Sequence, residues 1–265
     1  ITVKFGGAAM GEKELSSSFA KNIVLLKQVG VNPVVVHGGG PRIKKMLDRL
    51  NVKSSFVNGL RITDKETMSI VEMVLSGSIN KELVMEINKE GGRAIGLSGK
   101  DALLVETTKI QSSGKDKSKK HPDLGFVGFP NKVNNEFLSW CLKSDFVPVI
   151  SPIGYGKDYE TFNINADTMS GSIASSIFSE RLIMLTDVNG VLDKNGDLLS
   201  QITVNEAKKL IKNGTISDGM IPKVETCIEA VKNGVKAAVI LNGKLPNSIL
   251  LEMFTEHGVG TLITS

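Results

Sequence analysis

Two short β-branched segments of this chain each run directly into a cluster of glycines, and this feature constrains the fold more than any other. Thr2–Phe5 is followed by Gly6 and Gly7, and Val34–His37 is followed by Gly38–Gly40. A helix-forming stretch comes next in both places, so each unit predicts a strand, a tight turn and a helix. Repetition of this unit predicts parallel strands connected by helices.

The alternation of strand and helix continues along the chain and indicates an α/β fold. The expected strands and helices, in chain order, are Thr2–Phe5, Glu14–Gln28, Pro33–His37, Pro41–Leu50, Phe146–Ser151, Asp167–Phe178 and Leu182–Thr186. We therefore expect a largely parallel sheet covered by helices. The length of 265 residues allows one large α/β domain or two lobes, and a hydrophobic content of 41% is enough to fill a core.

One insertion interrupts the alternation between Val105 and Val127. Thr107–His121 is polar and contains the five lysines Lys109, Lys115, Lys117, Lys119 and Lys120. We expect a solvated hairpin or a mobile loop here. A basic patch for nucleic acid is the alternative, but no aromatic residues lie between the lysines and the net charge of the chain is only +4. We therefore expect no nucleic-acid partner.

Composition argues against several other classes of protein. The longest apolar runs fall far short of the about 18 residues that span a bilayer, so we expect no membrane segment. The first residues already belong to an expected strand, with no signal peptide or other targeting segment. The two cysteines, Cys141 and Cys227, cannot build a disulfide framework or a four-ligand zinc site, and only three histidines are present. These features favour a cytoplasmic protein.

The glycine turns suggest a site for an anion. The familiar phosphate-loop, dinucleotide-turn and nucleophile-elbow signatures are absent from the sequence. The N-terminus of a helix presents unpaired N–H groups and a partial positive charge, and glycines let an anion approach them. The two turns therefore predict a phosphate-binding cradle. Ordinary turn formation between strand and helix is the alternative interpretation of each one.

Two lysines, one aspartate and one asparagine are candidates for this chemistry. Lys4 lies in an expected buried strand, where an unpaired ammonium is costly to desolvate, so we expect it to face a site. Lys223 follows Pro222 in the first turn of an expected helix, where a cation is unfavourable unless an anion binds there; a surface lysine is the alternative. Asp167 either caps a helix or holds two lysines or Mg²⁺ in place. Asn163 could hydrogen-bond a polar substrate.

Two further segments admit two interpretations each. Thr186 and Asp187 end an expected strand, which is simple turn chemistry or the edge where open α/β sheets bind ligands. A helix expected over residues 64–89 begins with a capping box of Thr63 and Glu66 and is apolar around most of its circumference. Such a helix is buried either by the domain core alone or also by a second subunit.

A set of ordered motifs spans essentially the whole chain. In order they are VKFGGAAM, VVVHGGGPRI, VNGLRIT, GLSGKDALLV, DLGFVG, FNINADTMSGSIA, LTDVNGVLD and SDGMIPKV. This set resembles the amino acid kinase family and, within it, the enzymes that phosphorylate N-acetyl-L-glutamate. The resemblance implies a three-layer αβα sandwich around a mainly parallel open sheet. It also implies two lobes, residues 1–160 for the acyl amino acid and dimerisation and residues 161–265 for ATP.

The resemblance also implies a role for each motif residue. Lys4 and Lys223 match the lysines that stabilise the transferring phosphoryl group, and Asp167 matches the carboxylate that organises them. The implied substrate-binding residues are Gly39, Gly40, Arg61 and Asn163. The implied ATP-binding residues are Gly6, Gly7, Thr186, Asp187, Val188, Asn189, Gly190, Val191, Thr215, Ile216 and Ser217. No residue is implied as a metal ligand.

The implied reaction transfers a phosphoryl group from ATP, used with Mg²⁺, to the side-chain carboxylate of N-acetyl-L-glutamate in arginine biosynthesis. A kinase of another carboxylate or of carbamate, and a catalytically silent sensor of arginine or nucleotide, stay open as alternatives. The resemblance implies a homodimer or a hexamer of dimers. Residues 250–261 resemble the arginine-inhibited branch, so arginine is a candidate effector, although the N-terminal helix of that branch does not precede the first strand here.

Overall fold

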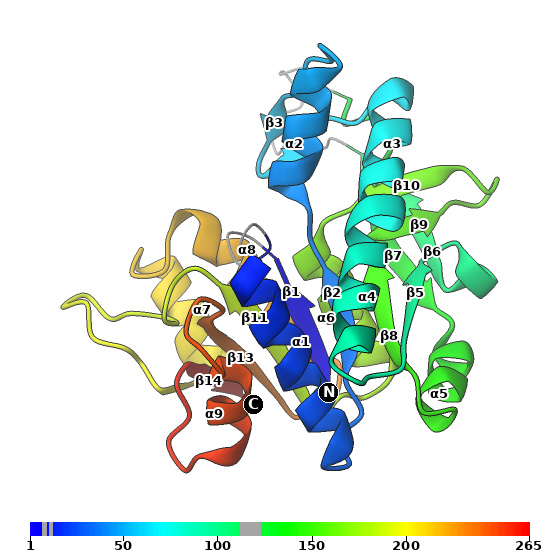
Figure 1. The fold of residues 1–265 in the computed structure, drawn as a ribbon. Coiled ribbons are helices and arrows are strands. Elements are labelled where there is room, and N and C mark those ends of the chain that lie inside the picture. Colours follow the sequence, from blue (N-terminus) through cyan, green and yellow to red (C-terminus); the bar gives the residue numbers. More distant parts are fainter. Residues whose placement is uncertain (7–9, 11–12, 112–122) are drawn as a thin grey trace.

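The central feature of the fold is an eight-stranded sheet that separates two layers of helices (Figure 1). The structure is a computed structural model that describes residues 1–6, 10, 13–111 and 123–265. From one edge to the other, the strands are β12(Gln201–Thr203), β14(Thr261–Thr264), β13(Ala237–Asn242), β11(Arg181–Thr186), β1(Thr2–Phe5), β2(Val34–His37), β8(Val147–Ser151) and β5(Ala94–Ser98). Neighbouring strands are parallel except β13 and β14. The predicted αβα sandwich with a mainly parallel open sheet is confirmed.

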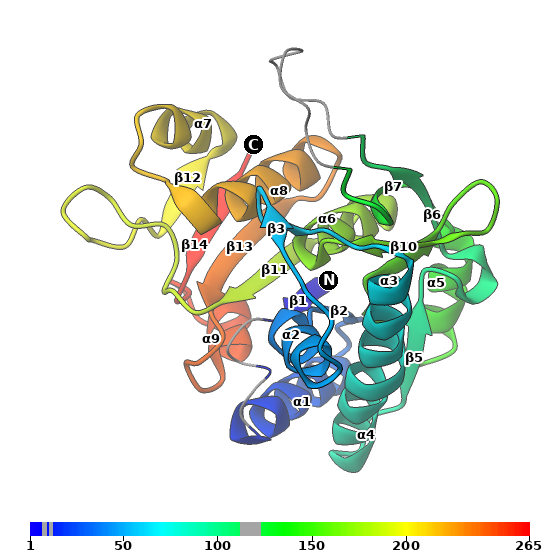
Figure 2. The ribbon, with the colours of Figure 1, turned by 90° about the horizontal axis from the view of Figure 1, so that it is seen from above.

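Helices cover both faces of this sheet, as Figure 2 shows from above. One face is covered by α1(Lys13–Gln28), α4(Asn80–Lys89) and α9(Ser248–Phe254). The other face is covered by α5(Asn135–Lys143), α6(Ala166–Ser176), α7(Val204–Lys212) and α8(Ile221–Lys232). Alternate residues of a strand point to opposite faces, so Val3 and Phe5 of β1 enter the core beneath α1. Lys4, between them, points to the face that α6 covers.

Smaller elements stand around the carboxyl edge of the sheet. Four strands form a small closed barrel, β10(Thr161–Ile164), β7(Val127–Val133), β6(Val105–Lys109) and β9(Ile153–Tyr155). Helix α2(Gly40–Arg49) and the hairpin of β3(Phe56–Val57) and β4(Leu60–Arg61) rise above the ends of β1 and β2 (Figure 1). Two single turns are η3(Asp101–Leu103) and η4(Asp218–Met220). Because β10 leads directly into α6, the barrel delivers residues to the same edge of the sheet.

The long helix predicted over residues 64–89 is present, with two differences. It consists of α3(Lys65–Glu72), a π-helical segment η2(Met73–Ile79) and α4. Its N-cap is Asp64, whose side chain accepts a hydrogen bond of 2.8 Å from a backbone N–H in the first turn. The predicted capping box of Thr63 and Glu66 is therefore wrong, and the Thr63 hydroxyl instead donates to a backbone carbonyl upstream of the helix.

The predicted polar insertion begins later than expected. Thr107–Lys109 belong to β6, which pairs antiparallel with β7, and the Thr107 side chain is buried. Of the two expected forms, the hairpin agrees with this antiparallel pair, and a mobile loop at these three residues is wrong because they form a strand. The remaining lysines, Lys115, Lys117, Lys119 and Lys120, lie outside the described residues, so the interpretation of that part stays a prediction.

Two other expectations concern lobes and membranes. Strands from both predicted lobes share one sheet, since β1 pairs with β2 on one side and with β11 on the other, and the division at residues 160 and 161 stays a prediction. Within the described ranges, no helix combines the length and the apolar character needed to cross a bilayer. Cys141 and Cys227 are both buried free thiols.

Candidate active site

Two lysines from distant parts of the chain meet on one buried carboxylate. The Lys4 Nζ atom lies 2.9 Å from Oδ1 of Asp167, and the Lys223 Nζ atom lies 2.7 Å from Oδ2. The side chains of Lys4 and Asp167 are only 8% and 10% exposed, and that of Lys223 is 22% exposed. The structure therefore brings together the three residues predicted to carry the chemistry.

The cap of α6 explains why the Asp167 carboxylate is free to meet both lysines. Asn165 caps this helix, since its Oδ1 atom accepts hydrogen bonds from the backbone N–H groups of Asp167 at 2.8 Å and Thr168 at 3.2 Å. The interpretation of Asp167 as the N-cap is therefore wrong. Asp167 is the second helical residue, and its side chain faces Lys4 and Lys223 instead of its own backbone.

Lys223 lies in the first turn of α8, as the position of Pro222 predicts. The partial positive charge of a helix N-terminus disfavours a cation there, but the Asp167 carboxylate compensates for it. The alternative of a solvated surface lysine is wrong, because the ammonium pairs with a buried group. An ion pair at the start of two neighbouring helices is the result.

The charges of this cluster favour an anionic ligand. Burial acts to raise the pKa of Asp167, but Lys4 and Lys223 outweigh burial, and the pKa lies below its ordinary value. Asp167 is therefore ionised at neutral pH. Two ammonium groups around one carboxylate leave a net positive charge, which attracts an anion such as a phosphate.

Glycines after β1 and after β2 let the backbone pass close to neighbouring side chains. A Cβ atom on Gly6 would lie 2.9 Å from Lys4 Nζ, so a larger residue there would displace the ammonium. A Cβ atom on Gly39 would lie 2.6 Å from side-chain methyl groups of both Leu75 and Ile79. The second turn therefore packs tightly beneath the π-helical segment and begins α2 at a fixed position.

A cavity of about 280 Å³ opens beside these residues at the carboxyl edge of the sheet. It is lined by Lys4, Asp167 and the four predicted substrate-binding residues, Gly39, Gly40, Arg61 and Asn163. Two larger hollows, of about 630 and 890 Å³, are not lined by these six residues. The smaller cavity is thus the place where the predicted substrate residues and the charged cluster face one another.

Arg61 is held in a fixed orientation at this cavity. Its guanidinium group donates hydrogen bonds to the Ser54 hydroxyl and, at 3.2 Å, to the Gly40 carbonyl oxygen, and its Cζ atom lies 4.5 Å from the ring centroid of Phe56. Burial lowers the pKa of Arg61, although a guanidinium remains charged at neutral pH. The Asn163 amide donates to a threonine hydroxyl at 3.3 Å. Together they offer a cation for a carboxylate and an amide for a polar group.

Apart from Gly6 and Gly7, the predicted ATP-binding residues lie in two segments, one after β11 and one before α8. Thr186 ends β11, and Asp187–Asn189 form an exposed bend after it, which Gly190 follows. Val191 and Ile216 are buried in the same core cluster, which brings the loop after β11 next to the segment before α8. The backbone of Val191 is already hydrogen-bonded, because its N–H donates to the Thr261 hydroxyl at 2.8 Å and its carbonyl oxygen accepts from the Leu199 N–H at 2.9 Å.

The surroundings of two further predicted ATP-binding residues, Thr215 and Ser217, are described by the structure, and those of Gly7 are not. The Thr215 hydroxyl is buried and has no hydrogen-bond partner among the described residues, so it has a free polar atom. Ser217 is exposed, and its hydroxyl donates to the neighbouring Asp218 at 3.0 Å. Gly7 lies outside the described residues.

The donor set does not form a dedicated metal cage. In residues 1–6, 10, 13–111 and 123–265, no group of three His, Cys, Asp or Glu side chains could hold a metal ion. Both carboxylate oxygens of Asp167 already face ammonium groups. Mg²⁺ in kinases is bound largely by substrate phosphates with one or two carboxylates, so the residues fit a metal that arrives with a nucleotide.

His37 and Asn80 support the site and were missed at the level of sequence. The buried His37 ring donates from Nδ1 to the Gly38 carbonyl oxygen at 2.9 Å, and its Nε2 accepts from the Asn80 amide at 3.2 Å. This assignment requires the neutral ring, which agrees with a pKa lowered to about 4 by burial. A histidine at the end of a buried strand and an asparagine in an apolar helix were the available signals.

Comparison with known proteins decides the family. Residues 1–242 match the amino acid kinase family, which is most of the chain. The chain belongs to the amino acid kinase family. The family predicted from the ordered motifs is confirmed.

Relatives within this family are similar along almost their whole length. A protein of Parvibaculum lavamentivorans named acetylglutamate kinase is 57% identical, over 99% of this chain and 88% of its own length. One of Rhodospirillum centenum with the same name is 55% identical, over 99% of this chain and 87% of its own.

Solved structures share the fold of this amino acid kinase family member. Protein smu.665 of Streptococcus mutans superposes with a TM-score of 0.79 at 29% identity, over 99% of this chain and 97% of its own. An N-acetylglutamate synthase of Neisseria gonorrhoeae, complexed with coenzyme A and N-acetyl-glutamate, has a TM-score of 0.86 at 23% identity. The present chain spans 59% of that synthase chain, so the likeness concerns the fold alone.

Proposed function

We propose that this chain is an ATP-dependent kinase that converts N-acetyl-L-glutamate to N-acetyl-L-glutamyl 5-phosphate in arginine biosynthesis. Relatives that are 53–57% identical over nearly its whole length are named acetylglutamate kinase. The structural observation that carries the proposal is the cavity in which Lys4 and Asp167 face Arg61 and Asn163.

The reaction requires positioning and charge stabilisation rather than a general base. The side-chain carboxylate of the substrate is ionised near pH 7, so one of its oxygens can attack the γ-phosphorus of ATP directly. The bond between the γ-phosphorus and the bridging β-phosphate oxygen breaks, and ADP leaves with that electron pair. The barrier lies in bringing two anions together in line and in neutralising the charge that spreads over the transferring group.

The charged cluster suits this task. Lys4 and Lys223 would donate to the oxygens of the transferring group, and each donor is expected to contribute about 3 kcal/mol to transition-state stabilisation, by analogy with oxyanion holes. Asp167 would hold both ammonium groups at fixed positions, as its contacts of 2.9 and 2.7 Å suggest. The backbone N–H groups of Gly39 and Gly40 at the start of α2 would add further donors.

Arg61 and Asn163 are assigned to substrate recognition. N-acetyl-L-glutamate has an α-carboxylate and an acetamide group besides the reacting carboxylate. The fixed guanidinium of Arg61 suits the α-carboxylate, and the Asn163 amide suits the acetamide. This pair is the feature that would select an acyl amino acid over smaller carboxylates or carbamate.

ATP would be held by groups at the end of β1 and on the side of β1 where β11 lies. Gly6 and Gly7 would contact its phosphates, and Thr186–Val191 with Thr215–Ser217 would contact its base and ribose. Mg²⁺, bound mainly by the phosphate oxygens, would neutralise charge on ATP.

Assembly, regulation and location are the less direct parts of the proposal. Met73 and Met85 are 62% and 64% exposed on the helix of α3, η2 and α4, which suits burial by a second copy in a homodimer or a hexamer of dimers. The resemblance of residues 250–261 supports arginine as an effector, and activity unchanged by millimolar arginine would count against it. Two free buried cysteines suit the cytoplasm.

Trapping with hydroxylamine tests the proposed reaction. Acyl phosphates give a coloured hydroxamate, so the protein is incubated with ATP, Mg²⁺ and, separately, N-acetyl-L-glutamate, glutamate, aspartate, aminoadipate derivatives or carbamate. We expect product with N-acetyl-L-glutamate alone. Product with another carboxylate would keep the mechanism but overturn the substrate, and a folded protein that binds ATP without forming product would indicate a sensor.

A further inference from the structure

Adjacent helices carry two members of the charged cluster. Asp167 is the second residue of α6, Lys223 is the third residue of α8, and a hydrogen bond of 2.7 Å joins their side chains. One turn along each helix from this pair lie Gly171 and Thr226. A Cβ atom on Gly171 would lie only 2.7 Å from the Thr226 Cγ2 atom, so the two helices approach too closely here for any side chain at the glycine.

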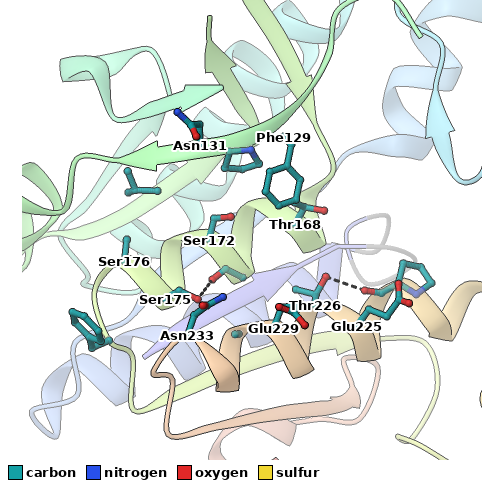
Figure 3. Close-up of a pocket in the computed structure, with 16 residues that line it drawn as sticks. Phe129, Asn131, Thr168, Ser172, Ser175, Ser176, Glu225, Thr226, Glu229 and Asn233 are labelled. Carbon is teal, nitrogen blue, oxygen red and sulfur yellow. Dashed lines mark hydrogen bonds between the residues drawn. The ribbon is translucent and has the colours of Figure 1, made fainter. Parts of the chain in front are cut away.

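The close contact with Thr226, rather than a need for an unusual backbone conformation, explains why residue 171 is a glycine. Gly171 lies in the interior of α6, where glycine costs about 1 kcal/mol relative to alanine. The Thr226 hydroxyl donates to the Pro222 carbonyl oxygen at 2.9 Å, which fixes the rotamer that directs the Cγ2 methyl at α6 (Figure 3). Helix propensity therefore favours alanine at position 171, but the Thr226 methyl group leaves no room for its Cβ atom.

Helices α6 and α8 border a groove on one side and share a core cluster. A groove of about 630 Å³ runs along one side of the crossing, and Thr168 and Ser172 of α6 border it opposite Thr226 (Figure 3). Ala174 of α6 and Ala230 of α8 are small buried residues of one core cluster, and Ala230 also lines the groove. From α8, the atom nearest to a side chain built on residue 171 is the Thr226 Cγ2 methyl, so this is the first contact that a larger residue would meet.

We propose that the contact between Gly171 and Thr226 sets the distance between Asp167 and Lys223, which makes Gly171 and Thr226 positioning residues for phosphoryl transfer. This inference rests on the proposed function. Carbon atoms in contact are normally about 3.5–4.0 Å apart, so a methyl group on residue 171 would move the helices apart by about 1 Å. Misplacement of about 1 Å at a catalytic centre can cost about 100-fold in rate.

Four variants test the proposal through the kinetic constants. Gly171→Ala is expected to lower kcat 10- to 100-fold with KM for both substrates nearly unchanged. Adding Thr226→Ser removes the Cγ2 methyl but keeps the hydroxyl, so Gly171→Ala/Thr226→Ser is expected to recover most of kcat. Gly171→Ala/Thr226→Val keeps the methyl and is expected to stay impaired. Ser172→Ala, on the neighbouring position of α6, is the control and is expected to leave kcat within about two-fold of the parent.

A second measurement does not depend on the reaction. The coupling between Asp167 and Lys223 is obtained from urea unfolding of the parent, Asp167→Asn, Lys223→Met and the double variant. In the Gly171→Ala background this coupling is expected to fall by more than half, and Thr226→Ser is expected to restore it. These results hold even if the parent phosphorylates a different substrate, so failure of the proposed function and failure of this inference are distinguishable.

Two outcomes would overturn the proposal. One is a Gly171→Ala variant with unchanged kcat and unchanged coupling. The other is a decrease in kcat of Gly171→Ala that Thr226→Ser and Thr226→Val restore equally, or that neither restores. The decrease would then not depend on the contact with the Thr226 methyl group. If Gly171→Ala alone fails to fold, recovery of folding and of kcat by Thr226→Ser, and not by Thr226→Val, remains the decisive comparison.

Discussion

At the scale of single residues, one carboxylate determines where two cations point. Asp167 is buried and ionised, and each of its oxygens faces a different ammonium group. Neither lysine can turn away without leaving a buried charge less well compensated. The ammonium groups are therefore held in place before any ligand binds, which is the condition for strong stabilisation of a transition state.

The first prediction concerns these lysines. Lys4→Ala and Lys223→Ala are each expected to lower kcat by about 100-fold or more while KM for ATP and N-acetyl-L-glutamate changes far less. Steady-state kinetics checks this. Lys232→Ala is the matched control, because it removes an exposed lysine that lies in α8 like Lys223 and pairs with Glu229 at 2.5 Å. This variant should leave kcat unchanged. Near-normal kcat in a Lys4 or Lys223 variant would remove that lysine from the mechanism.

His37 makes the stability of the chain sensitive to acid. Burial lowers the pKa of His37 from 6.5 to about 4 in the folded protein. Between these values the unfolded chain binds a proton that the folded chain does not, so stability falls as the pH decreases from about 6.5 toward 4. Above pH 6.5 the ring is neutral in both states and contributes no pH dependence.

The second prediction isolates this group. From pH 7.5 to pH 5 the parent is expected to lose about 2 kcal/mol more stability than His37→Asn, because asparagine keeps a donor for the Gly38 carbonyl oxygen but does not titrate. Urea unfolding at both pH values measures the difference. Equal losses in the two proteins would show that folding does not lower the pKa of His37.

At the scale of elements, helix caps position the chemistry. Asn165 ties down the first turn of α6, which carries Asp167. The two caps predicted incorrectly lie within two residues of the observed caps: Thr63 precedes Asp64, and Asp167 is two residues after Asn165. Threonine, aspartate and asparagine can all cap a helix, so only backbone geometry decides among adjacent candidates.

The third prediction compares the cap of α6, which lies at the site, with a cap that lies away from it. Asn165→Ala is expected to cost about 1 kcal/mol of stability and to lower kcat about 10-fold, because Asp167 loses its fixed position, whereas Asn165→Ser should retain most of both. Asn134 caps α5 by accepting from the Phe137 N–H at 3.2 Å, away from the cavity lining. Asn134→Ala should cost similar stability with unchanged kcat. Equal effects on kcat would contradict a positioning role for Asn165.

At the scale of the whole molecule, strand order brings the site together. β1 lies between β2 and β11, so the first glycine turn, the second glycine turn and the loop after β11 all reach the same edge of the sheet. Patterns in the sequence were enough to predict β1, β2, β8 and β11, the helices α1, α2 and α6 and the parallel sheet, because hydrophobic periodicity is local. They did not predict the four strands of the barrel. They were also enough to single out Lys4 and Lys223, since each is costly where it stands without an anion.

Other parts of the site could not be derived from local pattern. Arg61 comes from a hairpin and Asn163 from a barrel strand, and only tertiary structure places both at one cavity. Asn163 was a candidate for a polar substrate by its residue type, but Arg61 was assigned to the substrate only by the resemblance to a family. His37 and Asn80 escaped notice because a buried polar pair gives no periodic signal. The spacing between α6 and α8 likewise depends on one methyl contact that the sequence alone does not reveal.

The most direct test of the central claim follows one oxygen atom. N-acetyl-L-glutamate labelled with ¹⁸O in its side-chain carboxylate is incubated with ATP and Mg²⁺, the acyl phosphate is cleaved with hydroxylamine, and the released phosphate is examined by ³¹P NMR. Attack of the carboxylate on the γ-phosphorus predicts phosphate that carries one ¹⁸O atom, and the signal should be lost in Lys223→Ala. Phosphate without the label would show that water is the acceptor and would contradict the proposed reaction.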